Sequence, residues 1–229
     1  MTSIPTTARF TTRLYDSASL IWQKQLEHPF VRALVDGTLP QAKFEYYIRQ
    51  DALFLSELTK TFAFAATHTD EPGEMQKFGE LLLNTLQVER ALHQSYGEKF
   101  GLTTEQMAAT AMAPTNYAYT RHLLHIAATG SLPELLTSIL PCAWIYAEVG
   151  RHFQAQGLPT EDHAYREWLL TYASPDFEEV GAWLRGVLDG RAAGLDNAHL
   201  QRLESIFITS SRYEWMFWDM AWREEQWPV

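Results

Sequence analysis

The segment SLPELLTSILPCAWIYAEVG, residues 131–150, indicates the fold class, because its apolar residues recur in steps of three and four. This spacing marks one face of an α-helix, whereas the side chains of a half-buried strand alternate. Pro141 is expected to kink this helix, because proline lacks an N–H and its ring crowds the preceding turn. The inward positions continue just past the segment, and they are Leu135, Ile139, Cys142, Tyr146, Val149 and Phe153.

The rest of the chain repeats this helical pattern and shows no alternating strand pattern. No linker or internal repeat divides it. We therefore predict one all-α domain over residues 1–229, built from about eight to ten helices. Helix boundaries are predicted at Gly37 as a stop, at Thr38 and Gln41 as a capping box with Pro40 in the first turn, at Ser131 and Glu134 as a second capping box, and at Ser174 before Pro175.

The composition excludes several classes of function. The 229 residues carry a net charge of −10, which argues against nucleic acid as a partner, because nucleic-acid binding rewards clustered Lys and Arg. No stretch approaches roughly eighteen consecutive apolar residues, and the N-terminus has no apolar core of signal-peptide length. A single cysteine cannot form an internal disulfide, which fits a reducing compartment. We expect a cytoplasmic protein with no membrane partner.

Two acids fall on apolar helix faces. Asp51 follows Ile48 by three positions and precedes Leu55 by four, on a predicted helix from Pro40 to about Thr67. Glu214 lies in the middle of the inward face of the C-terminal helix. A buried carboxylate is costly unless it is paired or hydrogen-bonded, and burial raises its pKa. Each acid is either satisfied by a neighbouring polar group or part of a functional site.

Cys142 and a set of Glu/His pairs leave two further alternatives. A lone cysteine is commonly a small core residue, so Cys142 need not be a nucleophile. Glu89 with His93, and Glu148 with His152, could bind two metal ions inside a helical bundle. The usual bundle signature, however, places Glu and His three apart and adds a carboxylate from two further helices, whereas both pairs here are four apart. We therefore expect no metal and no cofactor.

Four blocks of sequence resemble the TenA (thiaminase II) family, in the family's order: HPFVRALVDGTLPQAKFEYYIRQDALFL, TNYAYTRHL, LPCAWIYAEVG and SSRYEWMFWDMAW. The resemblance covers the chain from about Phe10 to Trp227. It implies a heme-oxygenase-like multi-helical bundle, a homotetramer, and an active site inside each subunit.

The resemblance also implies roles for particular residues. Cys142 matches the nucleophile of the LPC block, Asp51 the acid of the QD block, and Glu214 the acid of the C-terminal block. This chain therefore resembles the cysteine-bearing branch of the family. Phe54 stands where a tyrosine is expected, which removes one hydroxyl contact. The substrate-binding residues that the resemblance implies are Asp51, Phe54, Tyr119, Tyr146, Tyr172 and Phe217.

The implied activity is hydrolysis of 4-amino-5-aminomethyl-2-methylpyrimidine to the hydroxymethylpyrimidine, with release of ammonia, in thiamin salvage; thiamin itself is the other implied substrate. We hypothesise that Cys142 attacks the ring, Asp51 stabilises the charge that results, and Glu214 moves the protons with Tyr119 holding it in place. Two rival hypotheses are a metal-dependent oxygenase using the Glu/His pairs and a pyrimidine-binding protein without catalysis.

Overall fold

A computed structural model describes residues 9–155, 157 and 160–229, except for residues 101–108 and the side chains of residues 88–100. The described residues form helices and no strand, as predicted. None of these helices has the length and apolar character needed to cross a membrane. The helices are α1 (Phe10–Leu26), α2 (Pro29–Val35), α3 (Gln41–Thr67), α4 (Pro72–Phe100), α6 (Pro114–Thr129), α7 (Leu132–Gln154), α8 (Arg166–Tyr172), α9 (Pro175–Ala192) and α10 (Asn197–Arg223).

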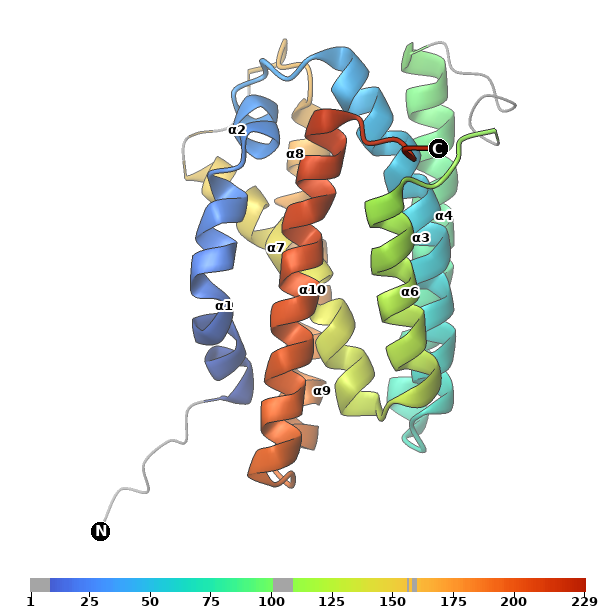
Figure 1. Ribbon diagram of the computed structural model, residues 1–229, viewed down its shortest axis with the longest axis vertical. Helices are drawn as coiled ribbons and strands as arrows, with labels where there is room; N and C mark the ends of the chain where they lie inside the picture. The colour runs from blue at the N-terminus through green and yellow to red at the C-terminus, as the bar shows by residue number, and fades with distance from the viewer. Residues whose placement is uncertain (1–8, 101–108, 156, 158–159) are drawn as a thin grey trace.

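The long helices form a bundle in which α10 runs between α1 and α6 (Figure 1). Helix α7 packs against both α10 and α9, and α3 packs against α4 and α6. The core between them is strongly aromatic: Trp218 stacks on Tyr47 and on Phe30, with both ring-centroid distances at 5.7 Å. Its indole N–H donates to Gln25 Oε1 over 3.1 Å, so its one polar atom is satisfied inside the core.

Most of the predicted helix boundaries are found, and one is wrong. Gly37 ends the turn after α2 with a φ of 72°, which favours glycine. The capping box at Ser131 and Glu134 forms, and Ser174 accepts a hydrogen bond from the Phe177 N–H. The box predicted at Thr38 and Gln41 does not form. Pro40 lies at the N-cap rather than in the first turn of α3, because the N–H groups of residues 38 and 39 both donate back to the Ala33 carbonyl.

Helix α7 carries the predicted nucleophile, Cys142. It continues through Pro141 as one helix, and most of its residues are buried. Gly150 lets α8 approach closely, because a Cβ at this position would lie 2.4 Å from the Tyr172 carbonyl oxygen. The apolar spacing of residues 131–150 thus corresponds to a buried helix held against α8, α9 and α10.

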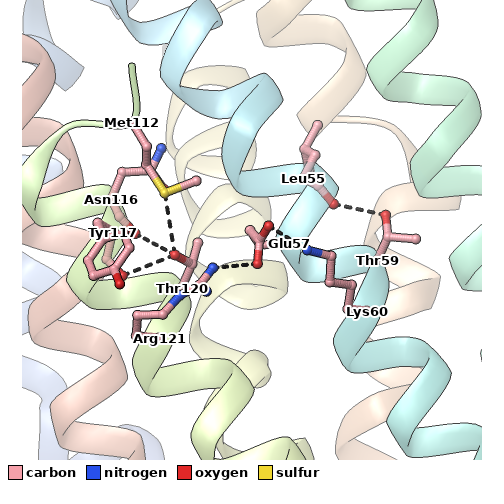
Figure 2. A network of polar contacts seen from close by, with 9 residues as sticks. All are labelled: Leu55, Glu57, Thr59, Lys60, Met112, Asn116, Tyr117, Thr120 and Arg121. Atoms are coloured by element: carbon pink, nitrogen blue, oxygen red, sulfur yellow. Dashed lines mark hydrogen bonds and ion pairs between the residues drawn. The ribbon is translucent and has the colours of Figure 1, made fainter. Parts of the chain in front are cut away.

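Helices α3 and α6 are joined by polar contacts along their length. Figure 2 shows Glu57 of α3 facing Arg121 of α6, with Lys60 on the other side of the same carboxylate. Deeper in the interface, the Asn116 side-chain amide donates to the Gln50 carbonyl over 2.7 Å. The Gln50 side chain bonds to the backbone at Ala111 and Ala113, with both distances 2.9 Å. This buried clamp fixes α3 at the position directly before Asp51.

The C-terminal segment, residues 224–229, crosses the ends of α3 and α6. The Glu225 carboxylate accepts a hydrogen bond from the Thr115 N–H over 2.9 Å at the start of α6. The backbone carbonyl of Glu225 accepts a hydrogen bond from the Tyr46 hydroxyl over 2.5 Å. The Trp227 indole donates to the Met112 carbonyl over 2.9 Å. A carboxylate at a helix N-terminus is electrostatically favourable, so this segment stabilises the first turn of α6.

Candidate active site

Four polar side chains from four helices converge inside the bundle. The Tyr119 hydroxyl of α6 donates to Glu214 Oε1 of α10 over 2.5 Å. The Cys142 thiol of α7 lies close enough to the same carboxyl group for each to shift the pKa of the other, and Asp51 of α3 is close enough to interact electrostatically with both Cys142 and Glu214. The structure therefore brings together the three predicted catalytic residues and Tyr119.

Burial changes the acidity of both carboxyl groups. Asp51 is 4% exposed and Glu214 is 2% exposed. Loss of hydration raises the pKa of Asp51 to about 7. Burial likewise raises the pKa of Glu214 to about 8, although the hydrogen bond from Tyr119 acts in the opposite direction. Near neutral pH, both groups can therefore gain or lose a proton, as a general acid or base must.

Burial favours the neutral form of the Cys142 thiol. Burial, followed by the charges of Glu214 and Asp51, raises the pKa of this thiol well above its usual range. A thiol beside two acids is expected either to have one of them protonated in the free protein or to ionise only when the substrate binds. The directions of all three pKa shifts agree with this expectation, because a neutral thiol beside a protonated acid avoids an accumulation of negative charge.

A cavity of about 350 Å³ gives access to this cluster. Asp51, Phe54, Cys142, Tyr146 and Tyr172 line it, whereas Tyr119, Glu214 and Phe217 are not among its lining residues. Asp51 Oδ2 is buried without a hydrogen-bond partner. A buried unpaired carboxylate oxygen is costly, so this atom is suited to a partner that a ligand supplies.

The predicted aromatic residues surround the cluster in two groups. Tyr146 and Tyr172 contact each other with ring centroids 4.7 Å apart, and both line the cavity. Phe54 also lines it and packs against Tyr119 at 5.1 Å and against Phe217 at 5.5 Å. Phe217 and Tyr119 thus support the cavity wall from behind. These flat walls fit a flat, ring-shaped ligand.

Several residues of this site are not predictable from the sequence. The Tyr47 hydroxyl donates to the Tyr146 hydroxyl over 3.2 Å, yet Tyr47 occupies an ordinary position on the apolar stripe of α3. The sequence offers no signal for Asn84 of α4 and Asp176 of α9, which line the cavity because α4 packs against α3 and α9 packs against α7. The hydrogen bonds from the Gln50 side chain to the backbone at Ala111 and Ala113 could not be predicted either, because the sequence shows only that Gln50 precedes Asp51.

Of the residues of the alternative metal site, Glu148 and His152 do not join this cluster. The Glu148 carboxylate accepts hydrogen bonds from the Trp144 indole and from Arg151. His152 lines a separate surface cavity beside α1 and α2. The side chains of Glu89 and His93 lie outside the described residues. Within the part of the chain that is described, no group of three or more His, Cys, Asp or Glu side chains is arranged to hold a metal ion.

Comparison with known proteins places the chain in a family. The model of the TENA/THI-4/PQQC family matches residues 15–224, and the chain belongs to this family. It is 40% identical over 220 residues to an aminopyrimidine aminohydrolase of Halalkalibacterium halodurans, covering 95% of this chain and 97% of that protein. It is 30% identical to the aminopyrimidine aminohydrolase of Bacillus subtilis, covering 96% of this chain and 92% of the relative.

Solved structures agree on the fold. A TenA homologue from P. horikoshii OT3 superposes with a TM-score of 0.87 at 34% identity, covering 94% of this chain and 99% of that one. Heme oxygenase-1 of the cyanobacterium Synechocystis superposes with a TM-score of 0.63 at 13% identity, covering 93% of this chain and 91% of that one. The latter likeness concerns the fold alone, and it confirms the predicted heme-oxygenase-like bundle.

Proposed function

We propose that this chain is an aminopyrimidine aminohydrolase. It hydrolyses 4-amino-5-aminomethyl-2-methylpyrimidine to the 5-hydroxymethylpyrimidine and ammonia in thiamin salvage. The observation that carries this proposal is the meeting of Asp51, Cys142, Glu214 and Tyr119 at an aromatic cavity. The names of the relatives that match over nearly the whole chain support the same reaction. The cytoplasm and a homotetramer are the location and assembly that we infer from the sequence.

The difficulty of the reaction is that an amine is a poor leaving group. In the proposed mechanism, Glu214 accepts the thiol proton of Cys142, and the sulfur adds to a ring carbon of the pyrimidine. The added electron pair is delocalised onto a ring nitrogen, which the protonated carboxyl of Asp51 stabilises by a hydrogen bond. This assignment uses the unpartnered Oδ2 of Asp51 and a pKa near 7.

The ring electrons then expel the amine from the methylene carbon. Glu214 gives its proton to the nitrogen of the leaving amine, which is released as ammonia. Glu214, now ionised, takes a proton from water, and the hydroxide adds to the exposed methylene carbon. The sulfur leaves the ring as a thiolate, which regains its proton from Glu214. One difficult displacement thus becomes several easier steps. Overall, one water is consumed and one ammonia is released, and Cys142 and Glu214 return to their starting states.

The mechanism needs Glu214 to donate and accept a proton twice in each turnover. A pKa of about 8 keeps both transfers close to balance near neutral pH. The hydrogen bond from Tyr119 holds the carboxyl group in one orientation. General acid–base assistance of this kind is worth roughly 10²–10⁴-fold in rate.

The test is ammonia release from 4-amino-5-aminomethyl-2-methylpyrimidine by the wild type, by Cys142→Ala and by Cys142→Ser. Circular dichroism and urea unfolding of each variant show whether the fold is intact. We expect turnover in the wild type alone, because neither alanine nor serine supplies a comparable nucleophile. Turnover that persists in a folded Cys142→Ala variant would remove the thiol from the mechanism. A wild type that releases no ammonia would refute the assigned reaction.

A further inference from the structure

The hydroxyl groups of Tyr47 and Tyr146 form a buried pair that the proposed mechanism does not use. Tyr47 lies on α3, one helical turn before Asp51, and Tyr146 lies on α7, one turn after Cys142. The Tyr47 hydroxyl donates to the Tyr146 hydroxyl over 3.2 Å. Tyr47 is fully buried, whereas Tyr146 is 5% exposed and lines the cavity. The pair therefore connects the closed core to the cavity beside Cys142.

The surroundings of Tyr47 fix the direction of this hydrogen bond. Its ring packs against Phe30, Trp218 and Trp168, with ring-centroid distances of 5.4, 5.7 and 6.2 Å. An indole N–H can donate a hydrogen bond but cannot accept one, and phenylalanine can do neither. Among the described residues, the Tyr146 oxygen is the one acceptor found for the Tyr47 proton. Because buried hydroxyl groups keep a partner, Tyr47 is the donor of the pair.

This direction leaves the proton of Tyr146 available to a ligand. A phenol carries one proton and also accepts through its lone pairs, so Tyr146 can accept from Tyr47 and donate elsewhere at the same time. In the described part of the chain, Tyr146 has no acceptor for its own proton. Burial raises the pKa of both hydroxyl groups well above their usual value, so both keep their protons near neutral pH. Linked hydrogen bonds polarise one another, which makes the outer hydroxyl a better donor.

We propose that Tyr47 is a positioning residue that holds the Tyr146 hydroxyl as a hydrogen-bond donor to the ring bound beside Cys142. The inference rests on the proposed function, because the aminopyrimidine of that reaction supplies the acceptor, a ring nitrogen. Tyr47 does not reach the cavity itself and acts only through Tyr146. Without Tyr47, the Tyr146 hydroxyl would lose both the bond that orients it and the polarisation that this bond provides.

Paired substitutions test whether Tyr47 acts through Tyr146. In a Cys142→Ala background, calorimetry gives the Kd of 4-amino-5-hydroxymethyl-2-methylpyrimidine for the parent protein, for Tyr47→Phe, for Tyr146→Phe and for both changes together. Each change removes a hydroxyl and keeps the ring, and urea unfolding shows whether the fold is intact. Tyr46→Phe is the matched control, because Tyr46 adjoins Tyr47 on α3 and its hydroxyl donates to the Glu225 carbonyl, away from the cavity.

We expect each single substitution to weaken binding roughly three- to tenfold, the range for one neutral hydrogen bond. Once residue 146 is phenylalanine, adding Tyr47→Phe should change the Kd by less than about twofold, because the two residues act as one unit. The control Tyr46→Phe should leave the Kd as it is. A merely structural role would weaken binding by the same factor whether or not Tyr146 keeps its hydroxyl. That result, or unchanged binding in Tyr47→Phe, would overturn the proposal.

Ammonia release by the wild type separates this inference from the proposed function. Release of ammonia together with equal effects of Tyr47→Phe in both backgrounds refutes only the role of Tyr47. Coupled effects on binding without ammonia release support that role and refute the reaction. Absence of both ammonia release and pyrimidine binding to the Cys142→Ala protein refutes both, because the ligand that supplies the acceptor would then be wrong.

Discussion

The buried carboxyl of Asp51 should make the protein less stable as pH rises. Its pKa is about 7 in the folded protein and about 3.9 in an unfolded chain. The folded state therefore binds more protons than the unfolded state between these values. Its stabilising contribution is fully present below about pH 4, declines as pH rises, and is lost above about pH 7. The whole difference corresponds to about 4 kcal/mol, a large part of the 5–15 kcal/mol typical of folding.

Substitution by Asn isolates this contribution, because the amide has nearly the same shape and does not titrate. Between pH 5.5 and 8.0 the pKa of about 7 accounts for about 2 kcal/mol of lost stability. We therefore expect the fall in unfolding free energy over this range to be about 2 kcal/mol smaller in Asp51→Asn than in the wild type. Glu214 still titrates in the variant, so some decline should remain.

Urea unfolding at pH 5.5, 6.5, 7.2 and 8.0 measures this difference. Asp70→Asn serves as the control, because Asp70 is exposed in the connection between α3 and α4. The pH dependence of the unfolding free energy should be the same in this variant as in the wild type. Equal pH dependence in the wild type and in Asp51→Asn would refute the reasoning. It would mean that Asp51 is ionised in the folded protein at all these pH values and has a compensating partner.

Three other predictions concern the same site and its supports. The pH profile of kcat/KM should show a group titrating near pH 8, and Glu214→Gln should remove this titration together with most of the activity. A flat wild-type profile between pH 5 and 9 would contradict the roles assigned to the site residues. Gly150→Ala should lower the unfolding free energy by more than about 2 kcal/mol, because its Cβ would overlap the Tyr172 carbonyl, and an unchanged urea midpoint would argue against this close approach. Gln50→Leu should cost about 1–3 kcal/mol in the same measurement, since it leaves the buried N–H of Ala113 unpaired and removes the bond to the Ala111 carbonyl, while a loss below about 0.5 kcal/mol would show that the clamp is dispensable.

The fold and the centre of the site can be predicted because their signals are local. Helical spacing identifies the inward faces of α3, α7 and α10, and an acid on such a face is conspicuous. Asp51 and Glu214 therefore stand out as unusual from the spacing of the apolar residues alone. Their convergence on Cys142 does not follow from spacing, because it depends on how the helices cross; the family resemblance is what indicates it.

Residues whose role depends on packing between helices are beyond such prediction. Asn84 and Asp176 are ordinary surface residues of their own helices, and only the positions of α4 beside α3 and of α9 beside α7 bring them to the cavity. Tyr47 is indistinguishable from a core aromatic until its hydroxyl is seen to reach Tyr146. The capping box predicted at Thr38 does not form, because the N–H groups of residues 38 and 39 bond to the Ala33 carbonyl and fix the turn. Rules for helix capping consider only the side chains at the helix start and do not include such competing backbone bonds.

The contact between Tyr119 and Glu214 also bears on how the protein is made. The two residues are separated by 95 positions, and Glu214 lies on the last helix of the chain. During synthesis, Cys142 leaves the ribosome well before Glu214, which accepts its proton in the proposed mechanism. A stalled or truncated product without α10 would thus carry the thiol with no proton acceptor from Glu214. In the proposed mechanism, catalysis by Cys142 therefore becomes possible only after the final helix has docked.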